Sequence, residues 1–359
     1  MKLFNFPLVV LDNILKQIPY GNLFLISLCS KKSISMIQMV GWKHIKEILY
    51  IIGIHEESEK GVVFIYIVDK LKNRSEVFSM QAFSFTMRGS SEITIFDKKT
   101  RWWHPYETHP FEIFLLGDDI FLQKIYTQFD NLFGKHAETT VEQLYTICPK
   151  KFLPIHLNIV RSHYRGVGLN PNYTYDLKDL EDYFESIPEQ EYVELNMAKM
   201  NTPLNPDSKF FNASRLVMFY SENNTEHILE NFKGENICLL NANFQCEWII
   251  VQLKRWKSKE GYLGLKKLYI KCSLSFDFNS MDSEEFEKEL NMKTLPPSIL
   301  PPVVELTQMH GLFPAEVTIP TYITRNDGIV ALLSVTLGMI VLSVRNFTEE
   351  EMLEGNCIE

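Results

Sequence analysis

Apolar residues recur at helical spacing through the first 40 positions. Leu11, Ile14, Leu15 and Ile18 follow the i, i+3, i+4, i+7 pattern that aligns side chains on one face of a helix. Pro7 suits the first turn of this helix, where its missing N–H costs no hydrogen bond. The pattern breaks at residues 19–22 and resumes in two segments, Leu23–Leu28 and Ser33–Val40. Three such short helices are too small to bury a core of their own, so we expect them to dock on another structure.

The pattern changes to strands after residue 44. β-branched and aromatic residues dominate four segments separated by polar or glycine-containing turns: Ile48–Ile54, Val62–Val68, Val77–Met87 and Glu92–Phe96. These segments predict an antiparallel β-rich unit over residues 45–110. A helix is predicted next over residues 118–133, with Ile120, Ile125, Phe129 and Phe133 along one side.

Helices and strands alternate from residue 175 to 273. Predicted helices near 176–187, 224–233 and 246–257 separate strands that start near 192, 215, 236 and 266, and Gly261 is expected to close the third helix. The strand starts are 23, 21 and 30 residues apart, close to the period of leucine-rich repeats, although the consensus Leu/Asn ladder is missing. We therefore expect a degenerate leucine-rich-repeat-like α/β domain with a parallel sheet, right-handed crossovers and an open face or edge for a partner.

Residues 329–344 are free of charge and allow two interpretations. A membrane anchor needs about 20 apolar residues, and Gly338 with several hydroxyl residues dilutes this shorter run. The dipeptides Asp327-Gly328 and Leu337-Gly338 are typical of turns between strands. The sequence favours a C-terminal hairpin over a membrane anchor.

Composition limits the class of protein. The 359 residues are 45% hydrophobic and carry a net charge of −9, which fits about two globular domains and disfavours a dedicated nucleic-acid binder. The six cysteines form no CxxC pair, so the sequence predicts neither a zinc ribbon nor a disulfide scaffold. A reducing compartment, the cytoplasm or the nucleus, is the expected location.

Few residue patterns point to catalysis. His104, Glu107 and His109 lie close together but between two prolines and without helical metal-ligand spacing. Cys148 and His156 are near each other in sequence only, and no GxSxG, Walker or GxGxxG motif is present. We expect no enzyme activity, no cofactor and no metal.

One basic stretch is a candidate binding surface. Seven cations fall between residues 254 and 271, with Trp256 and Tyr262 interleaved: Lys254, Arg255, Lys257, Lys259, Lys266, Lys267 and Lys271. Such a surface suits RNA or an acidic protein. The alternative is a solvated helix face with the turn that follows it, which is the commoner origin of charge runs.

The N-terminal pattern resembles an F-box. Its usual Leu-Pro opening corresponds to Phe6-Pro7, its Leu-rich helix to the apolar stripe, and its basic step to Ser30-Lys31-Lys32. Ser33 stands where tryptophan is usual, and residues 27–33 resemble the variant of the large nematode F-box family. An ordinary helical hairpin packed on its own domain is the alternative. The resemblance implies contacts to a partner from ten residues: Phe6, Pro7, Leu11, Ile14, Leu15, Ile18, Leu23, Leu28, Cys29 and Lys31.

The rest of the chain resembles the F-box-associated domain of that family. The resemblance rests on residues 215–221, 228–235, 253–258 and 325–328, and Arg345 stands where the family often has tryptophan. It implies an α+β protein with an F-box at 1–44, the β-rich unit at 45–110 and an F-box-associated domain at 111–359. It further implies a substrate adaptor of a ubiquitin ligase, which docks a Skp-type linker protein, and through it a cullin, and captures an unknown protein substrate. The alternative is a stand-alone binding module for RNA or an acidic protein.

Overall fold

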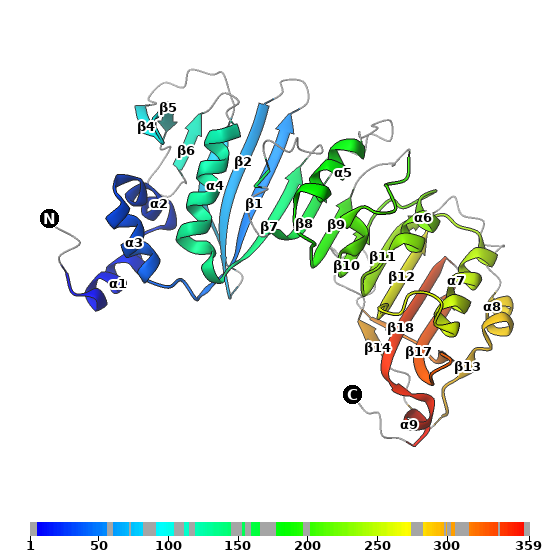
Figure 1. Ribbon diagram of the computed structural model, residues 1–359. Coiled ribbons are helices and arrows are strands. Elements are labelled where there is room, and N and C mark those ends of the chain that lie inside the picture. The colour runs from blue at the N-terminus through cyan, green and yellow to red at the C-terminus, as the bar shows by residue number, and fades with distance from the viewer. Residues whose placement is uncertain are drawn as a thin grey trace. The chain divides into compact units, whose positions relative to one another are not determined.

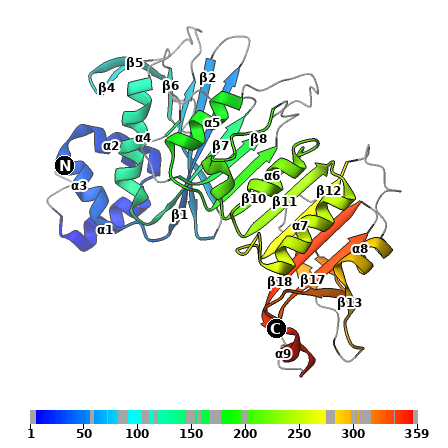
Figure 2. The ribbon, with the colours of Figure 1, turned by 45° about the vertical axis from the view of Figure 1, so that its right-hand side comes forward.

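The computed structural model in Figures 1 and 2 has α+β architecture, with helices at the N-terminus followed by sheet and further helices. It describes residues 6–55, 60–71, 73–81, 91–103, 111–114, 119–144, 153–154, 159–165, 177–196, 202–273, 283–297, 299, 303–305, 316–336 and 338–354. The chain divides into two compact units: a first unit of residues 1–170 and 175–190, and a second unit of residues 171–174 and 191–359.

The sheet of the first unit mixes parallel and antiparallel pairs. Its described strands lie in the order β8-β7-β1-β2-β3-β6-β5-β4. The pairs β1–β7, β7–β8 and β3–β6 are parallel, and the other neighbours are antiparallel. The strands are β1 (Ile45–His55), β2 (Lys60–Asp69), β3 (Arg74–Gln81), β4 (Ser91–Ile95), β5 (Lys98–Trp103), β6 (Phe111–Phe114), β7 (Glu138–Leu144) and β8 (Ile159–Arg165). The predicted antiparallel unit is therefore right for β1, β2 and β3, and the strand predicted at Glu92–Phe96 corresponds to β4, but β5 was not predicted and β6 enters in parallel from beyond residue 110.

Helix α4 (Asp119–Phe133) lies across this sheet, as Figure 1 shows, and joins β6 to β7 through η3 (Gly134–His136). Tyr126 of α4 packs edge-on against Tyr50 of β1, with ring centroids 5.1 Å apart. The predicted helix is confirmed, but Ile120 does not share its buried side and is 67% exposed. Five residues separate Ile120 from Ile125, which turns a helix about 140° past a full turn. Another helix of this unit, α5 (Leu177–Ser186), buries Leu180 and Phe184.

Three helices precede β1, as predicted: α1 (Leu8–Gln17), α2 (Tyr20–Cys29) and α3 (Lys31–Met39). Pro7 and Pro19 stand at the N-caps of α1 and α2, and the Ser30 side chain caps α3 by accepting a hydrogen bond from the Ser33 N–H. The boundaries at 44 and 110 that the sequence suggested fall inside the first unit. Whether those segments fold independently stays a prediction.

Parallel strands open the second unit at the predicted positions. These strands are β9 (Tyr192–Asn196), β10 (Arg215–Met218), β11 (Asn236–Ala242) and β12 (Lys267–Cys272). Two crossover helices, α6 (Thr225–Asn231) and α7 (Cys246–Ser258), lie on one face of this sheet in both ribbon views. The alternating α/β pattern is confirmed, because each helix brings the chain back for another parallel strand.

Both faces of this sheet are buried. Leu216, Ile237 and Leu268 occupy one register row, and the α7 side chains Ile249 and Trp256 are equally buried. The opposite face contributes a second core that includes Val217, Leu240, Tyr269, Leu332 and Val341. Helix α7 does not end at Gly261 as predicted. Lys259 adopts the left-handed conformation, with φ 68°, and its N–H closes the last turn on the carbonyls of Arg255 and Trp256.

Antiparallel strands complete the sheet in the order β12-β18-β17-β16-β13. These are β13 (Lys293–Thr294), β16 (Thr321–Thr324), β17 (Ile329–Thr336) and β18 (Met339–Thr348). A separate sheet pairs β14 (Val303–Glu305) with β15 (Glu316–Thr318), and the remaining elements are η5 (Lys209–Asn212), α8 (Ser283–Leu290) and α9 (Glu349–Leu353).

The hairpin interpretation of residues 329–344 is confirmed by the antiparallel pairing of β17 with β18. Gly328 and Gly338 have φ of 86° and 77°, a region that favours glycine at the two turns. No helix within the described residues is long and apolar enough to cross a membrane.

Candidate docking surface of the N-terminal helices

Aromatic stacking fixes α2 to the rest of the first unit. The Phe24 ring lies parallel to that of Phe129 of α4 at 4.3 Å between centroids, and edge-on to Phe78 of β3 at 5.6 Å. Gly21 lets the backbones approach, because a Cβ there would lie 2.7 Å from the carbonyl oxygen of Val77. The expectation that three small helices must dock is therefore met within the same chain.

Polar contacts and a second aromatic group reinforce this docking. Gln128 donates to Ser27 Oγ at 2.9 Å, and Gln38 donates to the Asn131 carbonyl, also at 2.9 Å. The Tyr20, Trp42 and Phe133 rings meet edge-on, with centroids 5.5 to 5.7 Å apart. Burial, and next the negative charge of Asp69, raises the pKa of Tyr20, so its hydroxyl stays protonated while it contacts His44.

Docking buries only part of the apolar surface of the three helices. Leu11, Leu15 and Leu23 are fully buried, together with Ile37 of α3. The N-terminal end of α1 is uncovered: Leu8 is 52% and Val9 74% exposed. Further exposed apolar side chains are Phe6, Val10 and Met39. We call Phe6, Leu8, Val9, Val10 and Met39 the uncovered apolar set. Leu8, Val9 and Val10 are consecutive at the start of α1, and exposed apolar side chains that adjoin one another in this way are typical of an interaction site.

The ten predicted contact residues thus fall into three classes. Leu11, Leu15 and Leu23 belong to the interior, where a partner cannot reach them without opening the helices. Ile14, Ile18 and Leu28 are half-buried. Phe6, Pro7, Cys29 and Lys31 are exposed. Their contacts to a partner stay predictions.

Sequence reasoning missed Leu8, Val9, Val10 and Met39 as exposed residues. One signal was present: residues 8–11 are four apolar residues in a row, Leu-Val-Val-Leu. A run of four covers every side of a helix, whereas burial against one neighbour needs only one stripe. The surplus apolar residues had to remain on the surface.

Three of the seven cations in the basic stretch pair with carboxylates of the second unit. Lys254 pairs with Glu289 at 2.5 Å, Lys259 with Asp327 at 3.3 Å and Lys266 with Glu235 at 2.8 Å. Arg255 donates to Gln252 Oε1 and lies over the Tyr262 ring. Lys267 and Lys271 are exposed on β12. A surface with this much internal pairing matches the solvated-face interpretation better than a binding site for RNA.

Lys257 has a structural contact of its own. Its ammonium donates to the carbonyl of Leu290 at the end of α8. Burial, and then the neighbouring charges of Lys293 and Lys254, lower the pKa of Lys257. This cation therefore helps to join α7 to α8 and is partly withdrawn from solvent.

The other candidate residues for chemistry fall on segments that the structure does not describe. The His104 to His109 segment, Cys148 and His156 lie outside the described residues. Among the residues that the structure describes, no group of three or more metal-ligating side chains occurs.

Comparison with known proteins identifies the N-terminal helices. Residues 3–44 match the F-box domain, a stretch that contains α1, α2 and α3. No curated protein and no solved structure matches the chain. An F-box domain supports, in general terms, an adaptor role in a Skp/cullin/F-box ubiquitin ligase and the binding of a Skp-type linker, and through it a cullin.

Proposed function

We propose that this protein is a substrate-recognition adaptor of a Skp/cullin/F-box ubiquitin ligase. The F-box docks the linker protein, and the chain that follows, residues 111–359 above all, captures a protein substrate. Proteins with an F-box are generally adaptors rather than enzymes, and we assign no catalytic step to this chain. We place the adaptor in the cytoplasm or the nucleus and retain the nematode F-box-associated resemblance as part of the proposal.

One observation carries the docking part of the proposal. Within the matched residues 3–44, the uncovered apolar set leaves Val9 74% and Met39 57% exposed. Burying a large apolar side chain at an interface contributes about 1.5–3 kcal/mol. Several such residues on one small unit are a costly surface unless a partner covers them.

A charge substitution on this surface provides the test. Leu8→Asp/Val9→Asp places two carboxylates on exposed positions, so the helices keep their interior and lose the apolar contact. We expect the tagged full chain to lose co-purification with a co-expressed Skp-type linker, while its circular dichroism stays unchanged. The matched control is Val251→Asp/Leu263→Asp, because these exposed apolar residues, 50% and 60% accessible, lie in the second unit.

The outcomes separate clearly. If the control abolishes linker binding as well, the effect is unspecific and the F-box surface is not the site. If the wild-type chain captures no Skp-type linker, or the Leu8/Val9 variant captures it normally, the adaptor proposal is wrong.

A further inference from the structure

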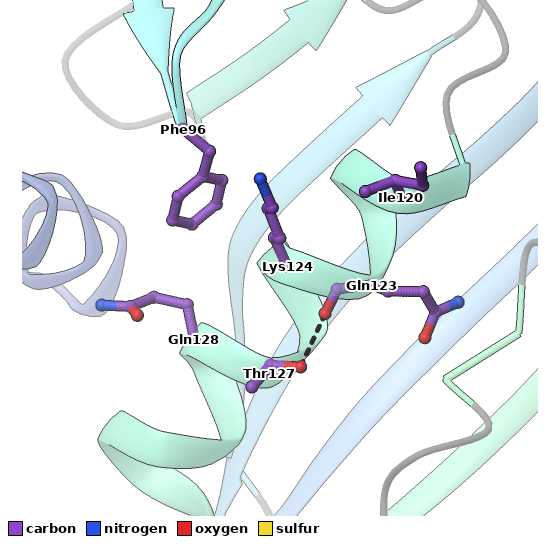
Figure 3. A pocket seen from close by; sticks show the side chains of 6 residues that line it. All are labelled: Phe96, Ile120, Gln123, Lys124, Thr127 and Gln128. Atoms are coloured by element: carbon purple, nitrogen blue, oxygen red, sulfur yellow. Dashed lines mark hydrogen bonds between the residues drawn. The ribbon is translucent and has the colours of Figure 1, made fainter.

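A groove lies between helix α4 and the turn that joins β4 to β5, all within the first unit (Figure 3). Its volume is about 490 Å³, within the usual range of binding pockets. The lining side chains are Phe96, Ile120, Gln123, Lys124, Thr127 and Gln128. Figure 3 shows Phe96 reaching from the turn toward α4. The groove can accommodate one large side chain with the backbone on either side of it.

The turn holds Phe96 in an unfavourable backbone conformation. Phe96 and Asp97 have φ of 48° and 66°, left-handed values that are common for glycine and asparagine and rare for a bulky side chain. The Phe96 ring meets the buried Phe121 edge-on at 5.9 Å between centroids, yet Phe96 remains only half-buried. Ile95 pairs with Lys98, so Phe96 and Asp97 are the two loop residues of a tight hairpin, which requires positive φ at both positions and places Phe96 in the lining of the groove.

The exposed side of α4 carries an apolar residue next to a positive charge. Ile120 is 67% exposed, one turn from the exposed Lys124. The structure gives Lys124 no hydrogen bond or ion pair to any residue that it describes. This distinguishes it from Lys254, Lys259 and Lys266, which all have acidic partners. The groove therefore offers the apolar side chains of Phe96 and Ile120 and one ammonium without an acidic partner among the described residues, which suit an apolar side chain next to a carboxylate.

The same helix also braces the F-box, through Phe129 and through Gln128 of the groove lining. Phe129 stacks on Phe24 of α2, and Gln128, at the end of the groove, donates to Ser27 of α2. A ligand held by Ile120 and Lys124 would thus sit on an element rigidly coupled to the F-box helices.

We propose that this groove binds a short segment of the ubiquitination substrate. An apolar side chain lies between Phe96 and Ile120, and an adjacent aspartate or glutamate pairs with Lys124. This inference rests on the proposed adaptor function and specifies the chemistry of the substrate: an apolar residue flanked by acidic ones. Binding on α4 fixes the segment relative to the docked linker, which is what transfer of ubiquitin to the substrate requires.

The test uses three sets of immobilised ten-residue peptides, each with a central Leu, Ile or Phe. The flanking residues are Asp and Glu in the first set, Asn and Gln in the second, and Lys in the third. The full-length chain, co-purified with its linker, is applied to the peptides. We expect the acidic set to retain more of it than the other two sets. Lys124→Glu should weaken that binding about fivefold and shift the preference toward the lysine set, because one pair turns from attraction to repulsion.

Two matched variants control this result. Lys135→Glu makes the same charge change at an exposed lysine beyond the end of α4 and should leave the preference unaltered. Ile120→Ser removes the apolar wall at an exposed position and should weaken all three peptide sets alike. The groove assignment is wrong if the wild type shows no acidic preference, or if Lys124→Glu behaves like Lys135→Glu.

Linker co-purification is measured for every variant. Unchanged linker binding with a lost peptide preference supports the proposal. Loss of linker binding in Lys124→Glu but not in Lys135→Glu would instead assign the groove to the linker and overturn it. If the wild type binds no linker, the adaptor function is wrong. The peptide preference of the wild type and of Lys124→Glu then decides separately whether the groove binds an acidic segment.

Discussion

The F-box helices and the basic stretch are the two surfaces that the sequence singled out, and they differ in how far contacts within the chain satisfy their side chains. The helices bury Leu11, Leu15 and Leu23 but leave Leu8 and Val9 uncovered. The basic stretch, by contrast, finds acidic partners within its own unit at Glu235, Glu289 and Asp327. A charged side chain loses little by pairing at a surface or by facing water, whereas an exposed apolar side chain gains when a partner covers it. The comparison favours the F-box surface as the place where another protein binds.

The largest expected effect separates the interior of the F-box from its surface. Leu11→Ala/Leu15→Ala removes two fully buried side chains, and each loss costs about 2–5 kcal/mol of unfolding free energy. We expect amide hydrogen exchange to accelerate throughout α1 and α2, and linker binding to fail because the helices open. Leu8→Ala/Val9→Ala should weaken linker binding with no change in exchange. Equal exchange in the two double variants would contradict the division into interior and surface.

A backbone contact tests whether the F-box is fixed to its own unit. Gly21→Ala places a Cβ against the Val77 carbonyl, which cannot move like a flexible side chain, so α2 must shift from β3 at a cost of about 1–3 kcal/mol. Faster exchange should appear in α2 and β3 and leave the second unit unaffected. Gly264→Ala is the matched control, since its Cβ would meet only ordinary contacts at 3.7 Å and beyond. Unchanged exchange in Gly21→Ala would mean that the docking described here is looser than the contacts indicate.

The second unit has its own sensitive glycine in the turn before β17. Gly328 has φ of 86°, and a β-branched valine there should cost about 1–3 kcal/mol through backbone strain. The denaturant midpoint of the second unit should fall in Gly328→Val, while linker binding by the F-box persists. A simultaneous loss of linker binding would indicate that the two units do not respond independently.

Charge reversal in the basic stretch should have a smaller effect on binding. Lys254→Glu/Lys259→Glu replaces two ion pairs with like charges facing Glu289 and Asp327. We expect a small drop in thermal stability that salt reduces, and linker binding equal to that of the wild type. RNA retained by the wild type in moderate salt and released by this variant would restore the alternative function as a nucleic-acid binder.

The smallest effect concerns pH and the Asp327 carboxylate. Its hydrogen bond to Arg325, and next that to Lys259, hold the pKa of Asp327 well below its ordinary value. Its contribution to stability is therefore complete above the ordinary aspartate pKa and is lost as the pH falls through the lowered value. Asp327→Asn should be less stable than the wild type at neutral pH, with the difference shrinking in strong acid. The matched control is Asp207→Asn, at another exposed position of this unit.

Local pattern predicted much of this fold. Periodicity placed α1, α4 and α7, and the strand starts at 192, 215 and 236 agree with β9, β10 and β11. Residues close to one another in sequence determine these elements. A helical stripe with a period of 3.6 residues, or a continuous apolar run, can therefore be recognised in the sequence alone. The sequence predictions were wrong where the usual residue preference for an element was not followed. Lys259 rather than Gly261 ends α7, and β5 starts with Lys-Lys-Thr-Arg, so its apolar signal is confined to Trp102 and Trp103.

The candidate site shows the same division between local pattern and tertiary structure. The sequence by itself determined that residues 6–40 form three helices with more apolar side chains than one stripe needs, because that is a count over neighbouring positions. Only the tertiary structure decided which of them remain free, since Phe78 and Phe129, more than 50 and 100 residues from Phe24, supply the surface that covers α2. The groove at Phe96 likewise requires a turn and a helix that are separated in sequence. Burial is a property of pairs of distant segments, so a linear pattern can show that surplus apolar surface exists but not where it stays exposed.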